Sequence, residues 1–174
     1  MSAQTYDVNT LLVEMSGSLQ TLITQNNIQD PLIIGIRSGG IWIAQKLHTN
    51  LAITTQLGTL DITFYRDDFT SIGLDPKVQP SKLPDSTQDR HIILVDDVIK
   101  SGRTIRAALN ELFDYGRPAS VTLVALLDLN CRELPISADI IGAKMSLEPG
   151  QHIKLLGPEP LTLNISQRQS LEDK

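Results

Sequence analysis

The sequence predicts an α/β fold with a mainly parallel β-sheet flanked by helices, a mobile loop and a small cap. Short apolar runs of strand length alternate with stretches whose apolar residues recur every three or four positions. This alternation is typical of parallel sheets that helices cover on both faces. A length of 174 residues with 41% hydrophobic content suffices for one core, so residues 1–174 are expected to form a single domain.

The first half of the chain begins with an amphipathic helix over residues 9–24, whose apolar residues have helical spacing. Residues 32–36 are uniformly apolar and predict a buried strand, and residues 41–47 predict the helix behind it. Residues 59–65 alternate like a strand. The following segment, residues 67–89, is polar and contains three prolines and a glycine, which predicts a mobile loop or hairpin.

The second half opens with a strand over residues 92–95, which is expected to end at Asp96 and Asp97. Residues 101–104 then begin a helix. Its apolar face is predicted from Ile105, Ala108, Leu109, Leu112 and Phe113.

Gly116 is expected to cap this helix, and Pro118 prevents its continuation. Residues 121–127 predict another buried strand. Short strands near residues 153–156 and 161–165 would form the cap.

The segment from Asp96 to Thr104 has the features of a site for a phosphorylated sugar. Gly102 lets an anion approach the backbone, the hydroxyls of Ser101 and Thr104 can donate, and the first amides of the helix point outward. Asp96 and Asp97 would lie beside this cradle at the carboxyl edge of the sheet, where carboxylates can accept hydrogen bonds from ribose hydroxyls and help to hold Mg²⁺. The simpler interpretation is that these residues only cap the helix. The combination of both features favours a ribose 5-phosphate site.

The run from Val95 to Val98, followed by residues 101–104, resembles the phosphoribosyl pyrophosphate (PRPP) signature of type I phosphoribosyltransferases. Three further stretches, residues 35–41, 61–68 and 132–139, resemble the PyrR family of bifunctional pyrimidine operon regulators and uracil phosphoribosyltransferases. The similarity covers nearly the whole chain and implies the type I phosphoribosyltransferase fold.

The resemblance implies an enzyme that transfers the 5-phosphoribosyl group from PRPP to uracil and yields UMP and pyrophosphate, with Mg²⁺ as cofactor. Asp96 and Asp97 would bind the ribose and Mg²⁺, and Asp97 would be the nearer of the two to the base. Arg66 would face the charge that develops on pyrophosphate, and the loop after it would close over PRPP. The substrate-binding residues would be Lys100, Ser101, Gly102, Arg103 and Thr104 for the 5-phosphate, and Arg37, Ser38, Gly39 and Gly40 for pyrophosphate.

The sequence departs from the family's pattern at three places. Gly39 stands where many members carry a second cation, and Lys100 stands where an aromatic residue is common. Leu129, Asn130 and Cys131 replace an Arg-Gly-His run between Asp128 and Arg132, in the loop that lies near the uracil in the family. The departure at Gly39 implies weaker pyrophosphate binding or a contribution from another residue. The departures at Lys100 and at residues 129–131 concern base selectivity and RNA contacts rather than PRPP binding.

Two alternative functions stay open. One is a UMP-responsive RNA-binding regulator of pyr gene expression with weak catalysis, whose partner would be pyr leader mRNA. The formal charge of -5 and the absence of any lysine or arginine before Arg37 rank this role below catalysis, because RNA binding needs a basic surface. The other is a phosphoribosyltransferase for a purine base.

Composition also predicts the setting of the protein. No apolar run has transmembrane length, the amino terminus lacks a signal-peptide pattern, and Cys131 is the single cysteine, so a cytoplasmic protein without membrane contact is expected. No histidine has a partner at metal-ligand spacing. The resemblance implies a homodimer or a higher homo-oligomer.

Overall fold

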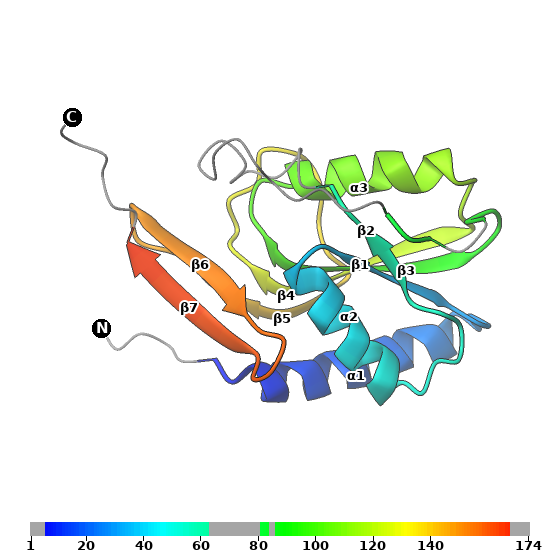
Figure 1. The fold of residues 1–174 in the computed structure, drawn as a ribbon, viewed down its shortest axis with the longest axis horizontal. Coiled ribbons are helices and arrows are strands. Elements are labelled where there is room, and N and C mark those ends of the chain that lie inside the picture. The colour runs from blue at the N-terminus through cyan, green and yellow to red at the C-terminus, as the bar shows by residue number, and fades with distance from the viewer. Residues whose placement is uncertain (1–5, 63–80, 84–85, 168–174) are drawn as a thin grey trace.

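A parallel β-sheet forms the centre of the molecule (Figure 1). The computed structural model describes residues 6–62, 81–83 and 86–167. Within these residues the sheet has five strands in the order β2-β1-β3-β4-β5, and all neighbouring pairs are parallel. Their bounds are Leu32–Ile36 for β1, Gly58–Leu60 for β2, His91–Ile99 for β3, Ser120–Asp128 for β4 and Ile140–Lys144 for β5. The predicted α/β class with a parallel sheet is confirmed.

Helices cover both faces of this sheet (Figure 1). Helices α1 (Val8–Gln25) and α2 (Gly39–Asn50) pack on one face, and α3 (Arg103–Asp114) packs on the other. The predicted positions of the three helices are confirmed to within a few residues. None of the helices in the described part of the chain is long and apolar enough to cross a membrane.

Alternating side chains of the central strand β3 supply both cores. Ile93 and Val95 belong to the core beneath α1 and α2, whereas Ile92 and Leu94 belong to the core beneath α3. Each of the four is at most 1% exposed. Because successive side chains of a strand point to opposite faces, a strand buried on both sides has to be apolar throughout. This requirement explains the uniformly apolar run in the sequence.

The chain reaches a topological switch point at the carboxyl ends of strands β1 and β3. They are neighbours in the sheet, with Gly35 opposite Val95, yet α2 follows β1 on one face and α3 follows β3 on the other. Loops that leave neighbouring strands toward opposite faces diverge, and open α/β sheets bind their ligands at this switch point. The fold therefore places residues 37–40 and the end of β3 at the position where a ligand site is expected.

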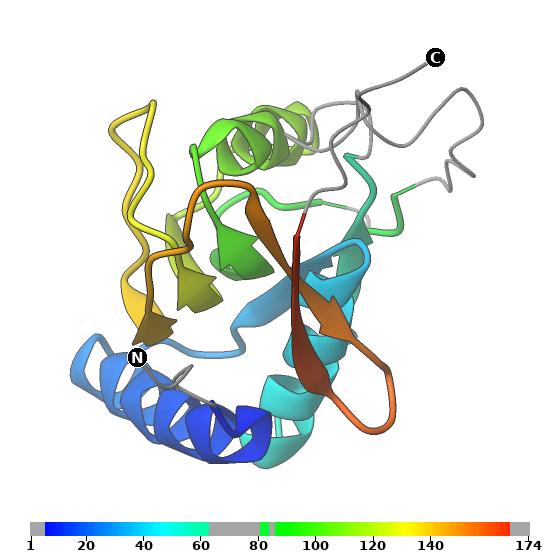
Figure 2. The same ribbon diagram turned by 90° about the vertical axis from the view of Figure 1, so that its left-hand side faces the viewer.

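A two-stranded antiparallel hairpin, β6 (Gln151–Leu156) and β7 (Thr162–Gln167), lies beside the carboxyl ends of the sheet strands (Figure 2). Its turn contacts α2, since Glu159 pairs with Lys46 and a Cβ atom on Gly157 would lie 2.9 Å from the Trp42 ring. The predicted strands of the cap are confirmed, and the hairpin contacts the helix that begins at this switch point.

Asp7 caps the start of helix α1, and its carboxylate accepts hydrogen bonds from the amide and the hydroxyl of Thr10. These bonds favour the charged form and lower the pKa of Asp7 below its ordinary value. The predicted apolar stripe faces the core, with Leu12, Met15 and Leu19 at most 3% exposed.

The prediction that the strand ends before the acidic pair is wrong. Strand β3 continues to Ile99, because β4 is long enough to pair with it beyond Val95 and sets Asp96 opposite Ala125 and Ile99 opposite Asp128. Pairing with a neighbouring strand thus overrides the local preference of two aspartates for a turn.

Two other differences concern strand β5 and helix α3. Strand β5 was not expected, since its five residues include a glycine and are short for a pattern-based assignment. Phe113 is 55% exposed and lies outside the buried face of α3, whereas Ile105, Ala108 and Leu112 lie within it. The helix ends at Asp114, and Gly116 adopts a positive φ of 136°, as expected of a residue that stops a helix.

The expected strand over residues 59–65 is shorter in the described part, where β2 ends at Leu60. Residues 63–80 and 84–85, which include most of the predicted mobile loop, lie outside the described residues. Between these two stretches, Lys82 forms two backbone hydrogen bonds of 2.8 Å with Thr59 of β2. The chain therefore returns along the edge of the sheet.

Two glycine substitutions should change stability in opposite directions. A Cβ atom on Gly142 would lie 2.6 Å from the Leu126 carbonyl oxygen and 2.8 Å from the Met15 sulfur, so Gly142→Ala should lower the free energy of unfolding by about 1–3 kcal/mol. Gly17 is exposed within α1 and has no atom within 4 Å of the added methyl group, so Gly17→Ala should raise it by about 1 kcal/mol. Urea denaturation measures both, and changes of the same sign would contradict this packing.

Candidate active site

The loop after β1 packs directly against the acidic pair of β3. A Cβ atom on Gly40 would lie 2.5 Å from the Val95 carbonyl oxygen, and one on Gly39 would lie 2.2 Å from Oδ2 of Asp97. Contacts this short leave no room for a side chain at either position. The structure therefore brings together two predicted groups of residues, the loop 37–40 and the acidic pair.

Asp96 and Asp97 are enclosed by this contact. They are 3% and 8% exposed, and the Asp97 amide donates a 3.0 Å hydrogen bond to Oδ1 of Asp96. The sequence predicts the two residues at the carboxyl edge of the sheet. They do lie beside the carboxyl end of β1, because they follow Val95, the partner of Gly35. Their burial was not predicted, and Gly39 contributes to that of Asp97 through its close approach.

Arg37 is the cation of the loop after β1. Its Nε lies 3.5 Å from Oδ2 of Asp61, a carboxylate whose side chain is fully buried at the end of β2, while Arg37 keeps about a quarter of its own side chain exposed. The Asp61 amide donates to the Ser81 hydroxyl at 3.0 Å, and that hydroxyl donates to Glu111 of α3. Arg37 is thus held by a charge from the neighbouring strand, and Ser38 beside it is exposed.

The loop from Lys100 to Gly102 connects β3 with α3. Gly102 adopts a left-handed conformation with φ of 92°, which reverses the chain just before the helix. The buried Ser101 hydroxyl accepts a 3.2 Å hydrogen bond from the Arg103 amide, whereas the side chains of Lys100 and Arg103 are exposed and Thr104 is half-buried. An α-helix leaves its first amides without partners inside the helix, and these amides attract anions. The predicted cradle is therefore present as a loop followed by a helix start, but the Ser101 side chain is buried in the protein.

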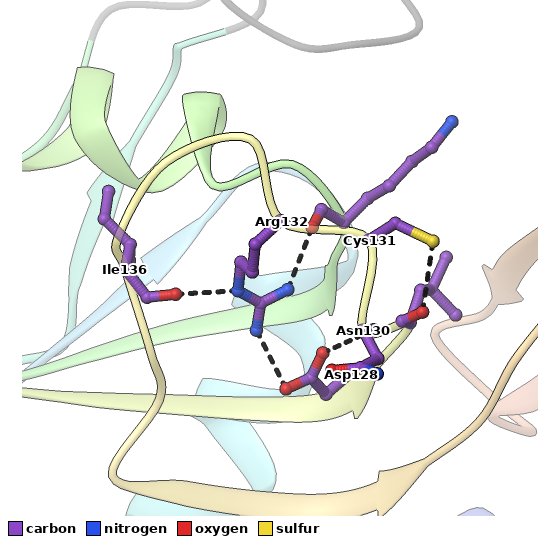
Figure 3. Close-up of polar contacts among 7 residues, drawn as sticks. Asp128, Asn130, Cys131, Arg132 and Ile136 are labelled. Carbon is purple, nitrogen blue, oxygen red and sulfur yellow. Dashed lines mark hydrogen bonds and ion pairs between the residues drawn. The ribbon is translucent and has the colours of Figure 1, made fainter.

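The loop after β4 folds back onto this cradle. The Ser101 carbonyl oxygen accepts hydrogen bonds of 3.0 and 3.1 Å from the amides of Glu133 and Leu134. Arg132 donates to the carboxylate of Asp128 and to the carbonyl oxygens of Lys100 and Ile136 (Figure 3). The sequence marked Arg132 only as part of a family motif, because nothing in its neighbours indicates that its partners lie at the end of β3.

The site can supply oxygen ligands for a metal ion. Among the described residues no cluster of three or more histidine, cysteine or acidic side chains forms a complete metal site. Mg²⁺ in phosphate-binding sites commonly takes one or two carboxylates together with waters and substrate phosphates. Asp96 and Asp97 fit such a partial ligand set. Arg66, the third residue predicted to act in catalysis, lies outside the described residues.

Histidine and cysteine side chains take no part in this arrangement. His48 bonds the carbonyl oxygen of Thr55 at 2.7 Å, and His91 bonds the Ser120 hydroxyl at 2.8 Å. The exposed Cys131 thiol contacts the Leu129 carbonyl oxygen.

Comparison with known proteins decides the family. The model of the phosphoribosyl transferase domain matches residues 7–152. A relative from Pseudomonas syringae pv. tomato, named Bifunctional protein PyrR, is 56% identical over 155 residues, which are 89% of this chain and 91% of that protein. The chain belongs to the PyrR family. A PyrR relative from Pseudomonas putida (strain W619) is 54% identical over 161 residues, which are 92% of each chain.

Solved structures support the fold of this PyrR family member. A hypoxanthine phosphoribosyltransferase from Trypanosoma cruzi, in complex with the product IMP, aligns with a TM-score of 0.62 at 20% identity and covers 80% of this chain and 76% of its own. The enzyme of the same name from Staphylococcus aureus aligns with a TM-score of 0.61 at 20% identity, again over 80% of this chain and 76% of its own. The predicted type I phosphoribosyltransferase fold is confirmed.

A methyl group at position 39 should disturb the acidic pair. Gly39→Ala places its Cβ atom 2.2 Å from Oδ2 of Asp97, so either the carboxylate or the start of α2 has to move. We expect the free energy of unfolding to fall by about 1–3 kcal/mol, as for other overpacked sites, and a crystal structure to show Asp97 displaced. Gly17→Ala, which adds the same methyl group in open space, is the control. An unchanged Asp97 in a stable variant would contradict the contact.

Proposed function

We propose that this protein is a uracil phosphoribosyltransferase, which converts uracil and PRPP to UMP and pyrophosphate. One observation carries the proposal: the chain is 56% identical to a protein named Bifunctional protein PyrR over about nine-tenths of both chains. The site supports it, since a glycine-rich loop, an acidic pair and a helix start meet at the switch point of the sheet.

The 5-phosphate of PRPP would bind at the start of α3. Helix amides carry a partial positive charge there, and the exposed Lys100 adds a full charge. The guanidinium group of Arg103 pairs with the Glu133 carboxylate, so Arg103 would contribute less than a full charge. Asp96 and Asp97 would accept hydrogen bonds from the ribose hydroxyls. Mg²⁺, when bound with PRPP, would neutralise part of the pyrophosphate charge.

Pyrophosphate would lie against the loop 37–40. Gly39 and Gly40 are buried against strand β3. The contacts would therefore come from the exposed Ser38 and from Arg37, whose charge is held in position by Asp61. Arg66 is proposed to face the same group from the segment outside the described residues. The chain would thus assign phosphate and pyrophosphate to different loops on either side of the acidic pair.

The reaction breaks the bond between the ribose C1 and a pyrophosphate oxygen, which leaves with the bonding electrons. A ring nitrogen of the base supplies the pair for the new bond and loses its proton to solvent or to a nearby base. The sugar is positively charged in the transition state, so a neighbouring carboxylate stabilises it. No covalent intermediate with the protein is required, and catalysis rests on orientation and electrostatics.

A second role in regulation is favoured by the word "Bifunctional" in the names of the relatives. In the family this role consists of binding pyr leader mRNA in response to UMP. Helix α1 carries no lysine or arginine, so in this chain the RNA phosphates would have to be neutralised by other elements. We also propose that the protein acts in the cytoplasm as a homodimer or a higher homo-oligomer.

Turnover is the direct test of the enzymatic proposal. Wild type should release pyrophosphate from PRPP and uracil, and Asp97→Asn should lower kcat/KM by about a hundredfold, because it removes a charge that stabilises the transition state. Asp114→Asn, an exposed position at the far end of α3, is the matched control and should retain wild-type activity. A folded wild type without turnover on any base would remove the enzymatic proposal.

Base selectivity is tested in the same assay. Uracil, hypoxanthine, guanine and xanthine are supplied in parallel, and uracil should be the best substrate of the four. The loop with Leu129, Asn130 and Cys131 differs from the family's pattern, which makes this comparison necessary. A preference for a purine would replace uracil in the proposal and leave phosphoribosyl transfer intact.

RNA binding tests the regulatory role. In filter binding with pyrimidine leader RNA, UMP should strengthen binding, and the logarithm of the association constant should fall linearly with the logarithm of the salt concentration. An unrelated RNA of equal length is the control. Equal binding of both RNAs, or none at physiological salt, would leave phosphoribosyl transfer as the proposed role.

A further inference from the structure

Arg132 connects three separate stretches of the chain (Figure 3). Its NH2 donates at 2.8 Å to Oδ2 of Asp128 at the end of β4, and its NH1 donates at 2.8 Å to the carbonyl oxygen of Lys100 after β3. Its Nε donates at 2.7 Å to the carbonyl oxygen of Ile136. All three nitrogens of the guanidinium group therefore serve protein oxygens, and the side chain is only 21% exposed.

The partners of Arg132 are themselves fixed. The other oxygen of the Asp128 carboxylate accepts a 2.8 Å hydrogen bond from the Asn130 amide. Asp128 is 6% exposed, and burial of an unpaired carboxylate would be costly, so the guanidinium group has a strong reason to stay. The Asp128 carboxylate thus fixes the guanidinium group of Arg132, which in turn holds the carbonyl groups of Lys100 and Ile136.

The position of the Lys100 carbonyl group sets the course of the cradle at the start of α3. Lys100 immediately precedes Ser101, whose carbonyl oxygen accepts hydrogen bonds from Glu133 and Leu134 of the same loop as Arg132. A Cβ atom on Gly102 would lie 3.4 and 3.5 Å from the Cβ atoms of Ile136 and Leu134. Residues 100–102 therefore pack against the loop 128–136 and are hydrogen-bonded to it.

We propose that Arg132 is a positioning residue for the 5-phosphate site: it holds the loop 100–104 in its binding geometry without contacting the ligand. This inference rests on the proposed function, because it assumes that the loop 100–104 binds the phosphate. It also couples the loop expected to lie near the base to the loop expected to hold the phosphate. An arginine is required, because a planar fork can serve three oxygens in fixed directions and an ammonium group cannot.

Binding of ribose 5-phosphate, measured by titration calorimetry, is the test. Arg132→Met should weaken it about tenfold, as expected when a binding group is displaced by a fraction of an ångström. Arg132→Lys keeps the charge but loses the fork, so it should bind nearly as weakly as Arg132→Met. Arg90→Met is the matched control. Arg90 immediately precedes β3, at the other end of the sheet, and it also donates to a backbone carbonyl oxygen, that of Asp30.

Steady-state kinetics separate positioning from general destabilisation. In Arg132→Met the KM for PRPP should rise about tenfold while kcat falls less, because the substitution affects phosphate binding more than the cleavage of the bond between C1 and pyrophosphate. All variants are compared at a temperature at which thermal denaturation shows them to be folded. A lower melting temperature with unchanged affinity for ribose 5-phosphate would show a merely structural role and overturn the inference.

Other outcomes are equally decisive. Wild-type affinity in Arg132→Lys would show that charge rather than geometry acts on the ligand, which also overturns the inference. If Arg132→Met does not fold, Asp128→Asn replaces it, since an amide offers one oxygen where Arg132 and Asn130 now use two. This variant should weaken binding about threefold, in the same direction. A wild type that neither binds ribose 5-phosphate nor forms UMP would remove the proposed function, and that result differs from each of these.

Discussion

The close approach of the loop after β1 to strand β3 is the constraint on which the site depends. Since β1 and β3 are neighbours and their helices leave to opposite faces, the loop 37–40 has to cross the level of the acidic pair. Glycines at positions 39 and 40 allow this crossing at distances that no side chain would permit. The same contact packs Gly39 against the Asp97 side chain, so packing that holds the fold also positions a residue of the site.

Buried acids at or near the ends of three strands, β2, β3 and β4, give this region its second feature. Asp61 follows β2, Asp97 lies in β3 and Asp128 ends β4, and all are largely or fully buried. Carboxylates are costly to bury unless they are paired or hydrogen-bonded. Arg37 pairs with Asp61 and Arg132 pairs with Asp128, so each outer acid holds an arginine from a loop of the site.

These two ion pairs act on different loops. Arg37 belongs to the loop assigned to pyrophosphate, and its carboxylate partner lies where the chain leaves β2. Arg132 belongs to the loop after β4 and reaches the carbonyl group that precedes the cradle at α3. The acidic pair of β3 lies between them. A phosphorylated sugar bound there would be surrounded by loops whose positions depend on strands outside the binding site, which is how a rigid sheet can orient a reactive bond.

The sequence by itself determined the α/β class, the three helices, the inner strands β1, β3 and β4, and the acidic and glycine-rich segments. These features follow from patterns that repeat within a few residues, such as the uniformly apolar run before Asp96. Only the tertiary structure decided that β3 continues to Ile99, that β5 exists, that Gly39 encloses Asp97 and that Arg132 reaches Lys100. Each of these depends on a contact between segments distant in the sequence, and such a contact leaves no local pattern because either partner alone would fit many other surroundings.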